Sequence, residues 1–276
     1  MTSYARPTRI DEALSLLARG DRTILAGGTD FYPSRVGMTP RDDVVDVTGL
    51  ADLRGIRQGA SDWRFGAAAT WAEVIEAKLP PLFDGLKLAA REVGGMQIQN
   101  SGTIAGNICN ASPAADGVPA LLALDARVEI AAAASRRTLP LEQFILGPRK
   151  TALSAGELVT AIVVPRPLHA ARSDFLKLGA RKYLVISIAM VACVLEVEDG
   201  VVRTARVAVG SCSPVAIRLP DLERALAGKA LDGDLAAQVQ PEHLIRLSPI
   251  DDVRASAAYR KEAALTLIRR SLERLA

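Results

Sequence analysis

Ser101-Gly102-Thr103-Ile104-Ala105-Gly106-Asn107 is the stretch on which the organisation of this chain depends. Its two glycines and small polar side chains leave backbone exposed where a bulky side chain would normally stand, and Gln97, Gln99 and Asn100 precede it. Glycine lets the backbone approach a ligand closely, and consecutive N–H groups can form an anion-binding concavity. The stretch therefore predicts a polar glycine turn that binds a ligand with several oxygens.

A second glycine turn, Ala26-Gly27-Gly28-Thr29-Asp30, lies upstream of the first stretch. The apolar segment Thr23–Ala26 predicts a short buried strand that runs directly into these glycines. The Thr29 hydroxyl and the backbone N–H groups can donate to an anion, whereas we expect a local role for the Asp30 side chain. Two such surfaces in one chain indicate a clamp on an elongated anion, such as the pyrophosphate of a dinucleotide.

The composition is that of an ordinary globular protein. The chain has 276 residues, of which 49% are hydrophobic and 24% charged, so it can form a sizeable core and is not a disordered segment. Lys and Arg total 34 against 31 Asp and Glu, and the basic residues are scattered. This balance argues against a nucleic-acid partner.

Cysteines and histidines are too sparse for several kinds of site. Cys109, Cys193 and Cys212 form no C-x-x-C pair, which argues against a disulfide framework or an iron–sulfur cluster in this chain and favours a reducing compartment. His169 and His243 are too separated for a histidine-rich metal site, and no metal site is expected. The sequence shows neither a signal-peptide pattern nor an apolar run long enough to span a bilayer, so we expect a cytoplasmic protein without a membrane span.

Several known fingerprints are absent from the sequence. There is no G-x-G-x-x-G between a strand and a helix, no P-loop and no G-x-S-x-G elbow. The histidines do not lie near a serine-bearing turn, which argues against a serine hydrolase. The sequence therefore offers no candidate catalytic residue.

Hydrophobic periodicity predicts alternating helices and strands in the first 165 residues. Gly20 is typical of a helix stop, and Thr70 with Glu73 forms the capping-box pattern that begins a helix. The expected helices are 10–19, 70–78, 82–93 and 118–124, and the expected strands are 23–26, 44–47, 63–67, 126–132 and 158–164.

The pattern changes after residues 165–172, which are the best candidate for a domain boundary. Strands are expected over 175–178, 186–198 and 201–210, with a hairpin turn at Glu198-Asp199-Gly200, and helices over 219–227, 234–238 and 255–275. This order predicts an α+β unit with helices on one face of a sheet. In the last helix, a stripe of Leu265, Ile268, Leu272 and Leu275 fits either core or a docking surface, and core is favoured.

Three motifs in register carry a family resemblance: Leu25–Asp30, Gln97–Ile108 and Ala111–Asp125. Their order and spacing, with Tyr259-Arg260-Lys261 opening the last helix, resemble the FAD-binding medium subunit of the xanthine dehydrogenase and carbon monoxide dehydrogenase family, the molybdenum hydroxylases. The resemblance covers essentially the whole chain. It implies an α+β protein with the two-subdomain FAD-binding fold of vanillyl-alcohol oxidase (the PCMH type), and a C-terminal domain like that of the CO dehydrogenase flavoprotein. The implied domains are 1–53 and 54–168 for FAD binding, and 171–276.

The resemblance also implies how FAD would be bound. The first turn would wrap the pyrophosphate and adenosine, the second would approach the pyrophosphate and the flavin ring, Asp116 would contact the sugar part, and Lys177 would lie near the isoalloxazine. Val93 and Val159 match positions that pack on the cofactor. The expected cofactor-binding residues are Ile24, Leu25, Ala26, Gly27, Gly28, Thr29, Asp30, Phe31, Val93, Thr103, Ile104, Ala105, Gly106, Asn107, Asp116, Val159 and Lys177.

Two of these residues have a simpler interpretation, and one departs from the family pattern. Asp116 could instead be the N-cap of the helix that follows it, and Lys177 could be a solvated charge on an edge strand. Ala105 stands where the family usually has glycine, so its backbone must have a negative φ or the ligand must lie further away. The four-cysteine iron–sulfur insertion of some relatives is excluded by the cysteine count.

The implied function is that of an electron-transfer oxidoreductase subunit. FAD in this chain would take electrons from the [2Fe–2S] clusters of a small partner subunit and pass them to an external acceptor. A large molybdenum–pterin subunit would oxidise the organic substrate, and the three chains would form a heterotrimer or its dimer. The alternatives are a stand-alone flavin-dependent oxidase or dehydrogenase of the same fold, and a flavin-free scaffold subunit.

Overall fold

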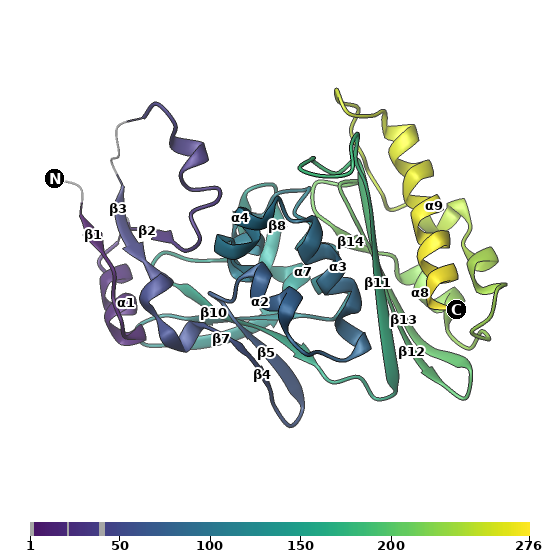
Figure 1. Cartoon of the computed structure of the whole chain (residues 1–276), viewed down its shortest axis with the longest axis horizontal. Helices are drawn as coiled ribbons and strands as arrows, with labels where there is room; N and C mark the ends of the chain where they lie inside the picture. The colour runs from purple at the N-terminus through teal and green to yellow at the C-terminus, as the bar shows by residue number, and fades with distance from the viewer. Residues whose placement is uncertain (1–2, 21, 39–41) are drawn as a thin grey trace.

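The N-terminal unit is a small parallel sheet with one helix. The computed structural model describes residues 3–20, 22–38 and 42–276 (Figure 1). The sheet has the order β1 (Tyr4–Ala5), β3 (Asp43–Asp46), β2 (Arg22–Leu25), and helix α1 (Ile10–Leu17) buries Ala13, Leu14 and Leu17. Gly20 has a φ of 82°, which confirms the expected glycine stop, although α1 ends at Leu17. The predicted order of a strand followed by a glycine turn is therefore present, because β2 leads directly into the turn at Ala26–Asp30.

The central unit is an antiparallel sheet covered by short helices. Its strand order is β4 (Ile56–Gln58), β5 (Asp62–Gly66), β10 (Leu158–Pro165), β6 (Arg127–Ala131), β7 (Arg136–Pro140). The helices are α2 (Trp71–Glu76), α3 (Asp84–Glu92), α4 (Met96–Ser101), α5 (Ile104–Asn110) and α6 (Gly117–Ala123). At the start of α2, Glu73 N donates to Thr70 Oγ1 at 3.2 Å and Thr70 N to Glu73 Oε2 at 2.6 Å, which confirms the capping box.

The prediction of a glycine turn reaching to Asn107 was wrong. The chain forms α4 up to Ser101, and α5 begins at Ile104, so that Gly102 and Thr103 are the whole connection. Thr103 is the N-cap of α5, because its Oγ1 accepts the N–H of Gly106 at 3.0 Å. The polar residues that suggested a loop therefore include a helix-starting signal, since threonine is favoured at the N-cap.

Short elements complete the first two units. The 3₁₀ helices are η1 (Pro33–Arg35), η2 (Val47–Gly49), η3 (Ala51–Leu53) and η4 (Pro81–Phe83), and helix α7 (Leu141–Phe144) leads into the hairpin β8 (Ile145–Gly147) and β9 (Lys150–Thr151). The sequence patterns did not predict these elements or strands β1, β4 and β7. The residues of β7 alternate poorly and are mostly exposed at the edge of the sheet, so their periodicity is weak.

The C-terminal unit is a second antiparallel sheet. Its order is β11 (Ala170–Leu178), β12 (Ala189–Glu198), β13 (Val201–Gly210), β14 (Ile217–Arg218), followed by α8 (Pro220–Leu226), η5 (Leu235–Gln238), η6 (Pro241–Leu244) and α9 (Ala257–Leu275). Asp199 and Gly200 have positive φ values between β12 and β13, which confirms the predicted hairpin turn. In α9, Ile268, Leu272 and Leu275 are buried, so the stripe packs in the core, with Leu265 half-buried at its margin.

The prediction that helices cover one face of this sheet was incomplete. Helices α8 and α9 pack on one face, and α3 and α6 of the central unit pack on β11, β12 and β13 from the other side (Figure 1). Residues Ala189–Leu195 of β12 are accordingly buried on both faces. Arg206 Nε of β13 also donates to Ala123 O at 2.8 Å, and Arg218 Nη1 of β14 donates to Leu122 O at 3.2 Å, at the C-terminal end of α6. Helix α6 is thus fixed between the two units.

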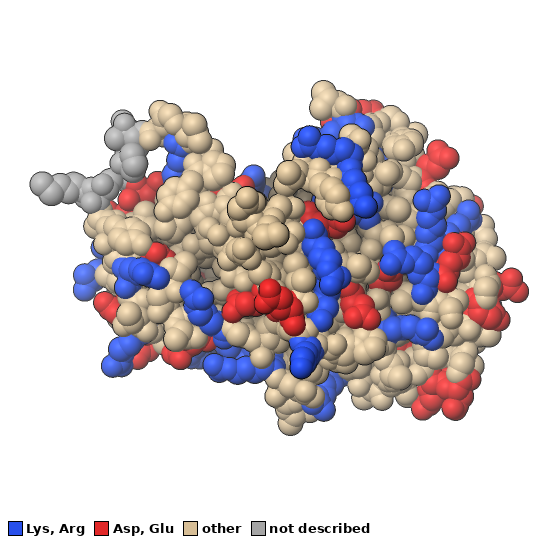
Figure 2. Space-filling view, viewed as in Figure 1, with Lys and Arg blue, Asp and Glu red and all other residues tan. Residues whose placement is uncertain are grey.

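Charges are dispersed over the visible face of the molecule. Figure 2 shows Lys and Arg interspersed with Asp and Glu, and it shows the surface hollowed over the central unit, between the N-terminal and C-terminal units. Of the helices in the described residues, none is long and apolar enough to cross a membrane.

Candidate functional site

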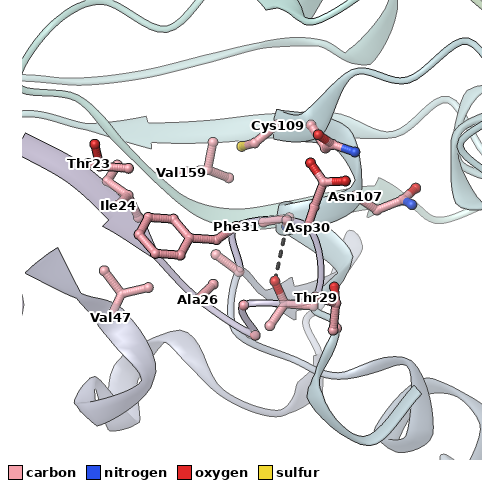
Figure 3. Close-up of a pocket in the computed structure, with 18 of the residues that line it drawn as sticks. Thr23, Ile24, Ala26, Thr29, Asp30, Phe31, Val47, Asn107, Cys109 and Val159 are labelled. Carbon is pink, nitrogen blue, oxygen red and sulfur yellow. Dashed lines mark hydrogen bonds between the residues drawn. The ribbon is translucent and has the colours of Figure 1, made fainter. Parts of the chain in front are cut away.

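The two glycine motifs meet at one cavity of about 480 Å³ between the N-terminal and central units. This volume is within the range of about 300–1,000 Å³ that is usual for small-molecule sites. Phe31, Ile24 and Val47 gather at one end, and Asp30, Asn107 and Cys109 lie toward the other (Figure 3). The lining residues are Thr23, Ile24, Ala26, Gly27, Gly28, Thr29, Asp30, Phe31, Ser34, Arg35, Val47, Leu53, Ala67, Trp71, Val93, Ile98, Gly102, Thr103, Ala105, Gly106, Asn107, Cys109, Asn110, Leu153, Leu158 and Val159.

The first turn needs its two glycines for different reasons. Gly28 has a φ of 72°, a left-handed conformation that side chains disfavour. An ideal Cβ at Gly27 would lie 1.8 Å from Ser101 O and 2.5 Å from Ser101 C, so the backbone of the first turn packs directly on the end of α4. Gly27 therefore brings the two glycine motifs into contact.

The second motif places the beginning of α5 along the cavity. Thr103 and Ala105 are buried, and Gly106 is exposed to the cavity. Ala105 lies inside a helix and is not among the residues with positive φ, so its methyl group is accommodated with ordinary helical backbone. The expected negative φ at this position is confirmed.

Asn107 carries a buried acceptor with no partner. Its Oδ1 is shielded from solvent and accepts no hydrogen bond from the described residues. An unsatisfied buried amide oxygen costs free energy, and a donor on a bound ligand would satisfy it. An oxygen-rich, elongated cofactor such as FAD fits this cavity, which combines exposed backbone at Gly106, hydroxyl and amide groups at Thr29 and Asn107, and an apolar end at Phe31.

Four of the expected cofactor-binding residues do not line the cavity. Leu25 and Ile104 are buried, and Asp116 and Lys177 form a separate pair. The other thirteen line it: Ile24, Ala26, Gly27, Gly28, Thr29, Asp30, Phe31, Val93, Thr103, Ala105, Gly106, Asn107 and Val159. The fold therefore brings residues from three distant segments to one surface.

Asp116 and Lys177 form a buried ion pair, contrary to both simpler interpretations. Lys177 Nζ lies 2.9 Å from Asp116 Oδ1 and 3.3 Å from Glu92 O, and its side chain is only 5% exposed, so it is not a solvated edge charge. Asp116 precedes α6 but makes no capping hydrogen bond, and its Oδ1 accepts from Ser187 Oγ at 3.0 Å. Burial raises the pKa of Asp116, and Lys177 offsets this rise only in part.

Several lining residues were missed by the sequence patterns. Cys109 and Asn110 line the cavity because the segment is helical. Ala105 and Cys109 are one turn apart in α5 and therefore share a face. Burial raises the pKa of Cys109 to about 12, so its thiol is protonated at neutral pH.

Arg35 also lines the cavity without having been expected there. It lies 3.8 Å from the centre of the Phe31 ring, a cation–π contact, and its Nε donates to Asp42 Oδ2 at 2.8 Å. No sequence signal in the chain identified Trp71 or Arg35.

Comparisons with known proteins agree with this architecture. Residues 1–167 match the family model of the FAD-binding domain in molybdopterin dehydrogenase, and residues 174–275 match that of the CO dehydrogenase flavoprotein C-terminal domain. The chain is 31% identical to the nicotine 6-hydroxylase medium subunit of Paenarthrobacter nicotinovorans, with 98% of this chain and 95% of that protein covered. It is 28% identical to the glyceraldehyde dehydrogenase medium chain of Sulfolobus acidocaldarius, with 99% and 98% covered.

Among solved structures, the reconstituted CO dehydrogenase from Oligotropha carboxidovorans matches with a TM-score of 0.90 and 28% identity, over 100% of this chain and 97% of that one. Fold, glycine motifs and sequence similarity over the full chain agree. The chain therefore belongs to the family of FAD-binding medium subunits of the molybdenum hydroxylases.

Proposed function

We propose that this chain holds FAD in the cavity between the two glycine motifs and serves as the electron-transfer subunit of a molybdenum hydroxylase. The observation that supports this most strongly is the direct contact of Gly27 with Ser101 beside a cavity that both glycine motifs line. Bound FAD supplies the ability to exchange electrons either singly or in pairs. The chain supplies position, electrostatics and access.

The lining residues have distinct roles in this proposal. The glycine motifs admit the pyrophosphate to the backbone at Gly28 and Gly106, and Asn107 Oδ1 accepts a hydrogen bond from the cofactor. Ile24, Phe31 and Val159 contribute apolar contacts with the cofactor, as does Val93. These assignments follow the family resemblance and the composition of the cavity.

Asp116 and Lys177 are proposed to act from outside the cavity wall. Their ion pair ties β11 to the start of α6, close in sequence to the α5 residues that line the cavity. A fixed positive charge in this region would favour the anionic form of a reduced flavin. Since Asp116 engages both Lys177 and Ser187, it also fixes where that charge stands.

The proposed partners are a small subunit with [2Fe–2S] clusters and a large molybdenum–pterin subunit, in a cytoplasmic heterotrimer or its dimer. The medium-chain designations of the relatives support a multi-subunit complex. A stand-alone oxidase with a histidyl flavin linkage is disfavoured. His169 pairs with Glu198, His243 caps η6, and neither lines the cavity.

The first test is the absorption spectrum of the purified full chain. A flavin band whose chromophore is released on denaturation supports FAD binding. A colourless chain with no affinity for added FAD contradicts it and favours the scaffold alternative.

The second test separates electron transfer from substrate oxidation in the holoenzyme. An ideal Cβ at Gly106 would lie 2.8 Å from Thr103 Oγ1, the hydroxyl that caps α5, so Gly106→Val displaces this hydroxyl and adds bulk beside the cavity. We expect this variant to lose FAD and the reduction of the external acceptor, while substrate still reduces the iron–sulfur clusters. Gly233→Ala is the control, because nothing lies within 4 Å of its Cβ position. Loss of cluster reduction together with FAD would contradict the proposed order of electron transfer.

A further inference from the structure

Arg149 adopts a backbone conformation that its side chain disfavours. It lies in the tight turn between β8 and β9, where Gly147 pairs with Lys150 and Pro148 precedes Arg149. The φ of Arg149 is 59°. Proline followed by a residue with positive φ is typical of the two central residues of a type II turn, and glycine or asparagine is preferred at the second of these two positions. An arginine at this position is strained, which suggests that its side chain has a role.

The side chain of Arg149 connects two elements that line the cavity. Its Nη1 lies 2.7 Å from Asp30 Oδ2, in the first glycine turn, and also contacts Asn110 Oδ1, at the end of α5. The N–H of Arg149 donates to Ala111 O at 2.9 Å, which docks the hairpin on the same end of α5. Since Asp30 belongs to the N-terminal unit and Asn110 to the central unit, one guanidinium joins the two sides of the cavity.

The charge of Arg149 also matters for an anionic ligand. Asp30 lines the cavity and carries a negative charge that would repel a pyrophosphate. Arg149 pairs with this carboxylate and offsets its charge. The side chains of Arg149 and Asp30 are both more than half exposed, so their ion pair can break and reform in water. The pair must break for a bulky cofactor to enter or leave the cavity.

We propose that Arg149 is a latch that slows the release of FAD by tying the first glycine turn to the end of α5. This inference rests on the proposed function, because it assumes that the cavity holds FAD. Arg149 is a positioning residue that acts through Asp30 and Asn110. The latch predicts an effect on dissociation, because the Asp30–Arg149 pair must break before the two sides of the cavity separate.

The test is the rate at which the full chain releases FAD, followed by the fluorescence of free flavin after dilution. Arg149→Gly removes the latch and also relieves the turn, so the apo-chain is expected to melt at the same temperature as wild type or higher. FAD release is expected to accelerate about two- to fivefold, as suits an exposed ion pair. Arg149→Asn, which tolerates positive φ, is expected to behave alike. Arg203→Ala breaks a similarly exposed pair with Glu198 and serves as the control with an unchanged release rate.

Exchanging the two charges identifies how Arg149 acts. The double variant Asp30→Arg with Arg149→Asp restores the pair in reverse, so slow release is expected to return. If Arg149→Gly releases FAD at the wild-type rate, or if the charge exchange fails to restore slow release, the latch is overturned. Both results leave FAD binding itself intact. A wild-type chain that binds no FAD overturns the proposed function and the latch together.

Discussion

Gly27 and Ser101 are in backbone contact, with the position of an ideal Cβ on Gly27 only 1.8 Å from the carbonyl oxygen of Ser101. This contact joins the N-terminal unit to the end of α4 at the edge of the cavity. Because the neighbouring atoms belong to the backbone, a methyl group cannot be accommodated by rotating a side chain. The relative placement of the two glycine motifs therefore requires that residue 27 has no Cβ atom.

Gly27→Ala is expected to separate the two motifs. Overpacking of this kind costs about 1–3 kcal/mol, and the lost docking should also abolish FAD binding. Thermal unfolding and FAD titration of the same preparation measure both effects. Gly233→Ala, in open space, should change neither. A Gly27→Ala chain that keeps wild-type stability and affinity would show that the contact is dispensable.

Arg206→Met is expected to destabilise the junction between α6 and the C-terminal sheet. Arg206 Nη1 lies 2.6 Å from Glu196 Oε1, and both side chains are largely buried. Removing one partner of a buried pair costs about 3 kcal/mol, since it leaves Glu196 with an uncompensated charge. Urea unfolding measures the change. Arg224→Met removes an exposed pair with Asp221 and should stay within about 0.5 kcal/mol of wild type.

The same pair predicts a pH dependence. Burial raises the pKa of Glu196, but the hydrogen bond and charge of Arg206 outweigh burial, and the net pKa is lowered. A carboxylate with a lowered folded-state pKa stabilises the protein above its unfolded pKa, and that stability is lost as pH falls through the folded pKa. Wild type should therefore lose this increment only below the ordinary glutamate range. In Arg206→Met burial raises the pKa of Glu196, so the unfolding free energy should instead rise as pH falls toward the ordinary glutamate range, because protonation relieves the buried charge.

Lys177→Met is expected to leave Asp116 as an isolated buried carboxylate. The pKa of Asp116 is already raised by burial despite Lys177, so the variant should raise it further. A raised folded-state pKa means that stability present at low pH is lost as pH rises through that pKa. We expect a loss of about 3 kcal/mol at neutral pH that shrinks in acid. Adding Asp116→Asn should recover much of it. Additive losses in the double variant would show that the two side chains are not coupled.

Cys109 is expected to be inert toward alkylating reagents at neutral pH, although it lines the cavity. Burial raises its pKa to about 12, and only the thiolate is the nucleophile. Mass-spectrometric mapping of iodoacetamide adducts at pH 7 should show little modification of native Cys109 and complete modification after denaturation. Rapid labelling of native Cys109 would mean that its thiol is more accessible and more acidic than this environment implies.

The sequence predicted the longer buried strands and the long helices well, because their apolar periodicities are clear, whereas it missed several short and edge strands. The strand before Gly27, the capping box at Thr70 and the turn at Asp199 are local signals, and each was found where expected. Helices α4 and α5 were missed because glutamines, asparagines and glycines suggest a loop, whereas Thr103 begins a helix. Local patterns favour the wrong state when tertiary contacts stabilise a short helix.

The residues of the site likewise include some that local sequence patterns predict and others that depend on tertiary packing. Glycine motifs can be recognised along the sequence, and with the family resemblance they predicted thirteen of the cavity-lining residues, about half of the lining. Arg35, Trp71 and Arg149 carry no local signal, because their positions depend on how distant elements pack. The pairing of Asp116 with Lys177 across the central and C-terminal units likewise depends on the docking of β11 beside α3 and α6.

Hydrogen exchange of the full chain with and without FAD tests the central claim most directly, because it reports each backbone segment separately. If the two glycine motifs form one FAD site, added FAD should slow exchange in residues 24–31 and 103–110 together, and exchange in α8 should be unchanged. Saturable FAD binding that protects neither segment, or only one of them, would contradict the claim.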